Sequence, residues 1–230
     1  MRLSALTLMG GMIVGSMAPG VAAQEIQGQL AITRTLTKQR VVLPAYSVRG
    51  VTPHKHEAAP KPINEWDRVV VYLEADNAPA AARITATLDQ TGQRFEPEML
   101  VVPVGSSVSF PNSDPIFHNV FSLSRTREFD LGFYPAGKMR IVNFNKVGVV
   151  QVFCHLHPDM NATILVVPNA WYTRPNEHGA FTFTGLSRGA YQVVVWHQAA
   201  GFFRQRIQVS EGGAARISME IPLAVNAPRP

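Results

Sequence analysis

The residues best suited to chemistry in this sequence are a cysteine, a histidine and a methionine placed three residues apart. They are Cys154, His157 and Met160, and a valine-rich run leads directly into the cysteine. Such a run predicts a strand that ends at Cys154 and a tight loop that presents the other two side chains. A further histidine, His118, lies upstream at the start of a second apolar run. A thiolate, two imidazoles and a thioether form a donor set that suits copper, with methionine as a weak axial ligand.

Cys154 is the only cysteine in the sequence, so it can form no disulfide within this chain. A free thiol is easily oxidised in an oxidising compartment, and the N-terminal sequence predicts export to such a compartment. The pattern therefore favours a cysteine that is occupied by a metal ion.

Two segments around these residues resemble the ligand regions of cupredoxins. The first is Phe110–Val120, which contains His118 and Asn119, and the second is the Cys-x2-His-x2-Met loop, whose spacing is similar to that of amicyanin. Gly148, six residues before the cysteine, also matches, and the resemblance extends from about Ala82 to Pro168. It implies one type 1 copper ion with His118, Cys154 and His157 as equatorial ligands and Met160 as the axial ligand.

His155 competes with His157 for the role of second histidine ligand. The resemblance favours His157, because only this residue gives the amicyanin spacing on both sides, whereas cupredoxins usually have threonine or serine at the position of His155. The resemblance also implies that Asn119 donates its backbone N–H to the sulfur of Cys154 and ties the two ligand loops together through its side chain. Leu156 stands where amicyanin has proline, so we expect a second N–H···S hydrogen bond from it.

The remainder of the chain predicts an all-β protein. Short apolar or alternating runs are separated by turn residues, with 17 glycines and 17 prolines in the sequence, and this pattern is typical of sandwiches and barrels. We expect a cupredoxin Greek-key β-sandwich and a second, smaller β-sandwich. The expected strands are Ile26–Thr33, Val69–Glu74, Arg83–Leu88, Met99–Val104, Ser107–Phe110, Asn119–Leu123, Met139–Asn145, Val149–Phe153, Thr163–Val167, Ala180–Thr184, Tyr191–Trp196, Arg204–Val209 and Arg216–Ile221.

The second sandwich is predicted from the segment Asn176–Trp196, which resembles the carboxypeptidase regulatory-like (transthyretin-like) fold. The side chains of Phe181, Phe183, Leu186 and Tyr191 would share one buried face. The strands at Gly28 and at Val69–Leu73 resemble the first strands of that fold. We therefore expect a discontinuous sandwich made of residues 24–78 and 169–224, with the copper domain at 79–168 inserted and a tail at 225–230. The alternative is an N-terminal extension followed by two separate domains.

Residues 1–23 have the features of a secretory signal peptide: Arg2, an apolar run and a small-residue end at Val21-Ala22-Ala23. The apolar run is shorter than the roughly 20 residues that span a membrane. No later stretch is long and apolar enough, so we expect no membrane span in the mature chain and a periplasmic location.

Residues 47–64 are predicted to form a proline- and histidine-rich loop. Its His54 and His56 form a His-x-His pair that could bind a metal weakly, although a solvated surface loop is the favoured interpretation. His178 and His197 are expected at structural or surface positions.

The net charge of the chain excludes few functional classes. Without the predicted signal peptide the 21 Lys and Arg residues fall by one, against 16 Asp and Glu residues, and no long basic block suggests a nucleic-acid partner. A cupredoxin followed by this sandwich resembles bacterial proteins of the methylamine-utilisation or plastocyanin-like type. The resemblance implies a one-electron carrier that cycles between Cu(II) and Cu(I) with a redox partner protein in the periplasm.

Two other classes stay open at this stage: a copper carrier or storage protein, and a non-redox envelope binding module. An enzyme is disfavoured. Phe153 stands where multicopper oxidases have the first histidine of their His-Cys-His motif, and seven histidines are too few for a trinuclear copper cluster beside this site.

Overall fold

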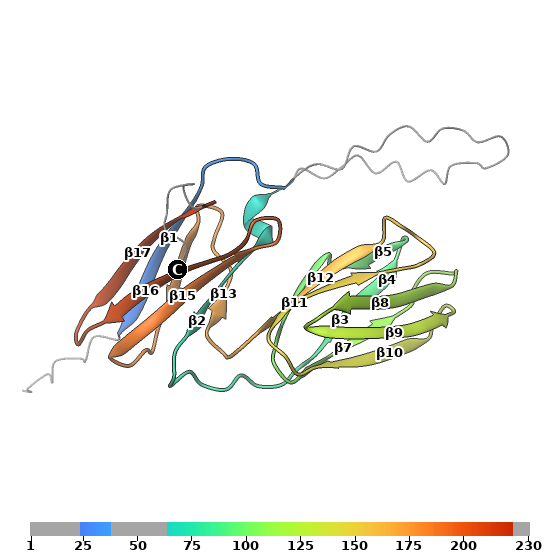
Figure 1. The fold of residues 1–230 in the computed structure, drawn as a ribbon, viewed down its shortest axis with the longest axis horizontal. Coiled ribbons are helices and arrows are strands. Elements are labelled where there is room, and N and C mark those ends of the chain that lie inside the picture. The colour runs from blue at the N-terminus through green and yellow to red at the C-terminus, as the bar shows by residue number, and fades with distance from the viewer. Residues whose placement is uncertain (1–23, 38–63, 223–230) are drawn as a thin grey trace, which may run out of the picture.

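The computed structural model describes residues 24–37 and 64–222 (Figure 1). The predicted signal peptide at 1–23, His54 and His56, and the predicted tail at 225–230 lie outside these ranges. The described residues form strands β1 to β17 and one short 3-10 helix, η1. The predicted all-β class is therefore confirmed.

The first of two sandwiches is formed by strands β3 to β12. A five-stranded sheet, in the order β6-β12-β11-β8-β9, faces a three-stranded sheet, β10-β7-β3, and β4 and β5 form a hairpin beside them. Alternate residues such as Val108, Val150 and Ile164 fill a common core between the two sheets. The strands are β3 (Thr85–Thr87), β4 (Asp89–Thr91), β5 (Arg94–Glu96), β6 (Met99–Pro103), β7 (Ser106–Pro111), β8 (His118–Ser124), β9 (Arg127–Tyr134), β10 (Met139–Phe144), β11 (Gly148–Phe153) and β12 (Asn161–Val167).

A second sandwich combines strands from both ends of the described chain. The sheet β14-β1-β17 packs on the sheet β13-β2-β15-β16 over a core that includes Ile26, Leu73, Phe181, Phe183 and Tyr191. Its strands are β1 (Glu25–Ile32), β2 (Val69–Glu74), β13 (Tyr172–Thr173), β14 (Ala180–Phe183), β15 (Gly189–His197), β16 (Gly201–Val209) and β17 (Ala214–Ile221).

The pairing of β1 and β2 bears on how the domains are arranged. β1 pairs with β14 and β17, and β2 pairs with β13 and β15, so strands that precede the first sandwich share sheets with strands that follow it. We propose on this pairing that residues 79–168 are inserted into a discontinuous sandwich. The likeness of that sandwich to the transthyretin-like fold stays a prediction.

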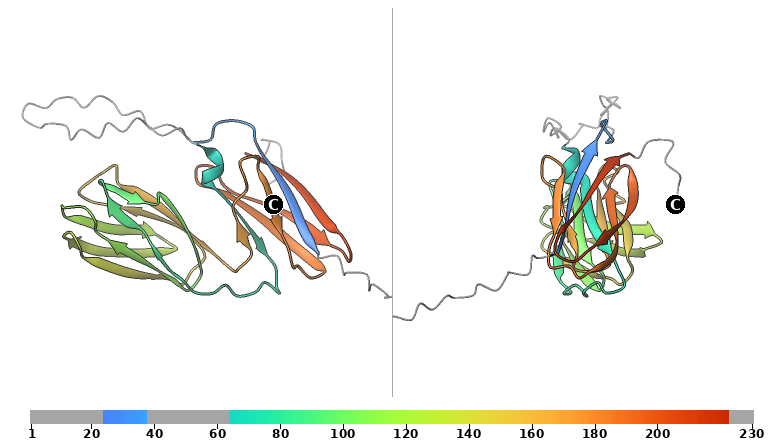
Figure 2. Two further views of the ribbon diagram at one scale, coloured as in Figure 1. Left: turned by 180° about the vertical axis from the view of Figure 1, so that it is seen from behind. Right: turned by 90° about the vertical axis from the view of Figure 1, so that its left-hand side faces the viewer.

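The two sandwiches pack against each other through the outer faces of two sheets (Figures 1 and 2). The shared cluster consists of Val70, Tyr72, Val194 and Trp196 from one sandwich and Met99, Leu165 and Val167 from the other. This contact explains why Val69–Leu73 is apolar without alternation, because β2 is buried on both faces. At its edge the Arg68 guanidinium donates to Gln198 at 2.6 Å, and Gln198 donates to Thr163 at 2.9 Å.

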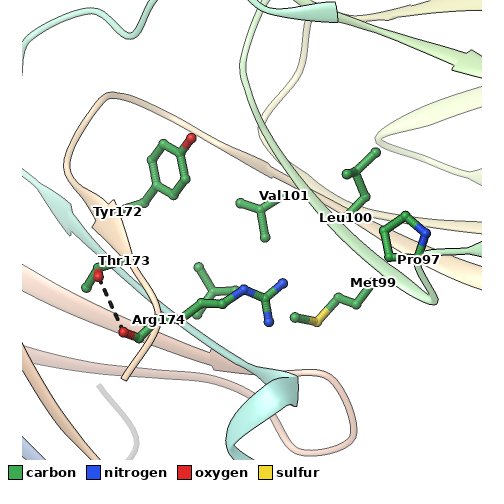
Figure 3. A pocket seen from close by; sticks show the side chains of 8 residues that line it. Pro97, Met99, Leu100, Val101, Tyr172, Thr173 and Arg174 are labelled. Atoms are coloured by element: carbon green, nitrogen blue, oxygen red, sulfur yellow. Dashed lines mark hydrogen bonds between the residues drawn. The ribbon is translucent and has the colours of Figure 1, made fainter. Parts of the chain in front are cut away.

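An open groove of about 660 Å³ lies beside this contact (Figure 3). It runs between β6 and β13, which are edge strands of their sheets. Its walls are mostly apolar, with Met99, Leu100, Val101 and Tyr172 facing it and Arg174 at its rim.

The prediction from sequence missed the strands β9, β4, β5 and β13. Most side chains of β9 are exposed, but Phe129, Leu131 and Phe133 alternate with polar residues and glycine as in a half-buried strand, so the signal was present in the sequence and was not used. The β4–β5 hairpin has only three residues in each strand, around Gly92 and Gln93. Strands of this length give almost no periodic signal.

A buried pair outside the copper region joins three segments of the second sandwich. His197 is fully buried, and its Nε2 lies 3.0 Å from the Glu65 carboxylate, while its Nδ1 accepts the N–H groups of Ala199 and Ala200. Glu65 also accepts from both N–H groups of Leu36 and Thr37. Burial lowers the pKa of His197, although Glu65 acts in the opposite direction. His197 is therefore a structural residue, as predicted.

This pair predicts a pH-dependent stability. Because the pKa of His197 is depressed in the folded state, the unfolded chain takes up a proton near pH 6.5 while the folded chain does not. The free energy of unfolding should therefore fall as the pH drops from 7 toward 5, with a slope of at most about 1.4 kcal/mol per pH unit. Urea titrations followed by tryptophan fluorescence measure this, since Trp66, Trp171 and Trp196 all belong to or pack on this sandwich.

The variant His197→Gln should have a shallower slope between pH 7 and 5. His178→Gln is the matched control, because the side chain of His178 is 80% exposed and should leave the slope unchanged. An identical slope in His197→Gln and the wild type would contradict the assignment.

Candidate metal centre

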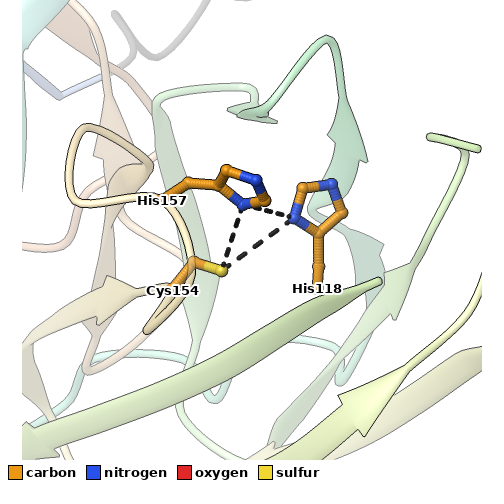
Figure 4. Close-up of side chains that lie close together, drawn as sticks. All are labelled: His118, Cys154 and His157. Atoms are coloured by element: carbon orange, nitrogen blue, oxygen red, sulfur yellow. Dashed lines mark hydrogen bonds between the residues drawn. The ribbon is translucent and has the colours of Figure 1, made fainter. Parts of the chain in front are cut away.

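Three of the predicted ligands meet at one end of the first sandwich (Figure 4). His118 is the first residue of β8, Cys154 directly follows β11, and His157 lies in the loop between β11 and β12. His118 and Cys154 are buried, and His157 is partly exposed. Their side chains point toward one another, and this is the group of potential ligands that converges within the described part of the chain.

The donor atoms form a triangle of suitable size for a metal ion. The two Nδ1 atoms of His118 and His157 are 3.1 Å apart, and the sulfur of Cys154 lies 3.9 Å from the first and 3.7 Å from the second. A point equidistant from these three atoms lies about 2.1 Å from each, which is close to metal–nitrogen and metal–sulfur bond lengths of about 2.0–2.3 Å. The donor set of two imidazoles and one thiolate therefore fits a single soft or borderline metal ion such as copper.

Two backbone hydrogen bonds close the loop that carries the ligands. The N–H of Cys154 donates to the carbonyl of Met160 at 3.2 Å, and the N–H of Met160 donates to the carbonyl of His157 at 2.9 Å. Met160 is buried and belongs to the same core cluster as Cys154. The loop thus holds Met160 in the buried core of the sandwich.

Asp114 is the functional residue that the sequence reasoning missed. Its Oδ2 lies 2.7 Å from Nε2 of His118, and both side chains are buried. Burial acts to raise the pKa of Asp114, but hydrogen bonds from Gln93, His118 and Gly92 outweigh it and hold the pKa below its ordinary value. The available signal was the placement of an acidic residue four positions before the histidine, within the loop quoted above.

His155 lies away from the three converging side chains. Its ring stacks on Phe121 with a centroid separation of 3.8 Å, and its Nε2 lies 3.8 Å from the carboxylate of Asp130. Its side chain is half exposed on the outer face of the sheet. The structure therefore places His157, and not His155, beside Cys154 and His118.

Two expected hydrogen bonds to the cysteine sulfur are not found. Within the described residues, the recorded neighbours of this sulfur are the two histidine rings, and neither Asn119 nor Leu156 donates a backbone N–H to it. The side chain of Asn119 donates to Asp130 at 2.7 Å, so it connects β8 to β9 and not to the ligand loop. The expectation that the side chain of Asn119 ties the two ligand loops together was wrong, because β9 supplies an acceptor for it.

Apolar residues surround the partly exposed His157. Phe117 is 55% exposed and Leu156 is 49% exposed, and Pro115, Ile116 and Pro158 are exposed beside them. The remaining histidine of the second sandwich, His178, lies on the surface, as predicted. Within the described ranges, no helix has the length and apolarity that crossing a membrane requires.

No protein-family model matches the sequence, and the comparison with curated proteins gives no match. Solved structures of cupredoxins resemble part of the chain. The purple cupredoxin from Nitrosopumilus maritimus is 22% identical over 36% of this chain and 99% of its own length, with a TM-score of 0.33. A reduced variant of amicyanin is 19% identical over 42% of this chain and 98% of its own length, with a TM-score of 0.35.

A copper-containing nitrite reductase from Thermus scotoductus SA-01 also resembles the chain. It is 23% identical over 47% of this chain and 28% of its own length, with a TM-score of 0.36. These likenesses concern the fold alone. The chemistry proposed below therefore rests on the geometry of the site.

The geometry predicts different effects for the two neighbouring histidines. His157→Ala removes one corner of the donor triangle, so the affinity for Cu(II) should fall at least 100-fold. His155→Ala removes a ring that stacks on Phe121 outside the triangle, and the affinity should change less than about threefold. Competition titrations with a chromophoric chelator measure both values. The reverse order of the two effects would show that the ligand assignment is wrong.

Proposed function

We propose that this protein is a periplasmic type 1 copper protein that carries single electrons by cycling between Cu(II) and Cu(I). The observation that carries the proposal is the buried triangle of Nδ1, Nδ1 and Sγ atoms described above. His118, Cys154 and His157 would hold the copper ion, with Met160 as a further, weaker ligand. The bound copper would supply the one-electron couple.

The protein's contribution is to hold the ligands in place before copper binds. His118 is fixed by Asp114, and the ligand loop is fixed by its two internal hydrogen bonds. Burial of Cys154 and Met160 excludes water from the inner side of the site. Ligands that are held in this way move little between the two oxidation states, so electron transfer requires little rearrangement.

The surface around His157 is suited to docking a redox partner protein. His157 is the partly exposed ligand, and exposed apolar side chains such as Phe117 and Leu156 surround it. An apolar patch around a ligand gives a partner close access to the metal, with little desolvation of charge. We propose this rim as the point of electron entry and exit.

The proposed location is supported by the sequence of the N-terminus. Residues 1–23 have the features of a secretory signal peptide. A single cysteine that is engaged by a metal is compatible with an oxidising compartment.

Voltammetry of the copper-loaded protein tests the proposal against a carrier or storage function. Because the ligands are held in place in advance, we expect a reversible one-electron wave that persists over repeated cycles. The copper-free protein, which should give no wave, is the control. Loss of copper on reduction, or binding of Cu(I) without a reversible wave, would contradict electron carriage and support the carrier function.

A further inference from the structure

A buried hydrogen-bonded chain links the ligand His118 to a hairpin on the far side of its loop. The Nε2 of His118 lies 2.7 Å from Asp114 Oδ2. A carboxylate can only accept, so the ring must donate from Nε2, and its Nδ1 lone pair then faces the sulfur and His157. The contact therefore selects the tautomer that a metal at the centre of the triangle requires.

The carboxylate of Asp114 is held from the other side by the turn between β4 and β5. The N–H of Gly92 donates to its Oδ1 at 2.6 Å, and the N–H of Gln93 donates to its Oδ2 at 2.8 Å. Both turn residues have positive φ angles, 59° and 56°, as in the two-residue hairpin turns that follow the right-handed twist of strands. This turn directs two neighbouring N–H groups at one carboxylate.

The side chain of Asn112 also fixes the loop between Asp114 and His118. The side chain of Asn112 accepts from the N–H of Asp114 at 3.1 Å and donates to the carbonyls of Ile116 and Tyr134. Asn112 and Asp114 are both buried. Asp114 thus has defined partners on every side, and its position is set by the protein and not by solvent.

We propose that Asp114, held by the Gly92–Gln93 turn, is the positioning residue that fixes the tautomer of His118 and favours Cu(II) over Cu(I) at the site. The inference rests on the proposed copper function. A negative charge one imidazole ring away from the metal stabilises the more positive oxidation state and makes the ligand nitrogen more basic. Asp114 touches no metal, and it acts through His118.

The substitution Asp114→Asn tests the charge with little change in shape. Its amide oxygen can still accept from His118 and Gln93, but its NH2 group cannot accept from the N–H of Gly92, and the negative charge is lost. We expect the ratio of Cu(II) affinity to Cu(I) affinity to fall about tenfold, because the lost negative charge stabilises Cu(II) more than Cu(I). Each tenfold fall raises the reduction potential by ~59 mV for a one-electron couple. An unchanged ratio would overturn the proposal.

Asp89→Asn is the matched control. Asp89 accepts from the hydroxyl of Ser113 at 2.8 Å, so it holds the same loop and carries the same charge without touching a ligand. The affinity ratio should change less than about threefold in this variant. Equal shifts in the two variants would show that general charge or loop anchoring is responsible, and would refute a specific role for Asp114.

A measurement on the copper-free protein separates this inference from the proposed function. Nitrogen-15 NMR of the histidine side chains should show the proton of His118 on Nε2 in the wild type, and a mixture of tautomers in Asp114→Ala. A proton on Nδ1 in the wild type would overturn the inference whether or not the protein binds copper. If the tautomer is as expected but copper gives no type 1 spectrum, the proposed function fails and the Asp114–His118 link stands.

Discussion

Three donor atoms can share one metal ion only if two loops 36 residues apart are held within bonding distance of a common point. In this protein the two sheets of the first sandwich supply that constraint. β8 begins at His118 and β11 ends just before Cys154, and the two strands lie side by side in one sheet. The core between the sheets fixes the strand ends, and the short loop hydrogen bonds then place His157 and Met160. The metal site is therefore a consequence of sheet register.

The second sandwich changes the environment of that sheet. It covers the outer face around Leu165 and Val167, so β12 is buried on both faces, which a free-standing sandwich of this kind does not require. The covered region lies away from the loops that carry the ligands (Figure 1). The packing thus leaves the apolar side chains of Phe117 and Leu156 exposed.

The sequence was sufficient to predict that His118, Cys154 and His157 converge, because Cys154 and His157 lie in one loop and His118 starts a recognisable strand. The sequence was not sufficient to predict the hydrogen bonds that hold these side chains in place. Asp114 meets Gly92 and Gln93, about 20 residues away, only after a hairpin of two three-residue strands has formed. Asn119 meets Asp130 because β9 pairs with β8, and the register of that pairing, which is shifted between Asn119 and Phe121, cannot be read from the periodicity of either strand. Contacts made by short or exposed strands leave little trace in composition or periodicity, and a family resemblance supplied the wrong partner for Asn119.

The most direct test of the account is the visible absorption and EPR spectrum of the protein after loading with Cu(II), measured beside Cys154→Ser. If the buried thiolate and the two imidazoles bind copper as the triangle of donor atoms requires, the wild type shows an intense thiolate-to-copper band and narrow copper hyperfine splitting. Cys154→Ser then loses both signals while the fold is retained. A wild type that takes up Cu(II) without that band, or a Cys154→Ser variant with the same spectrum, would contradict the account.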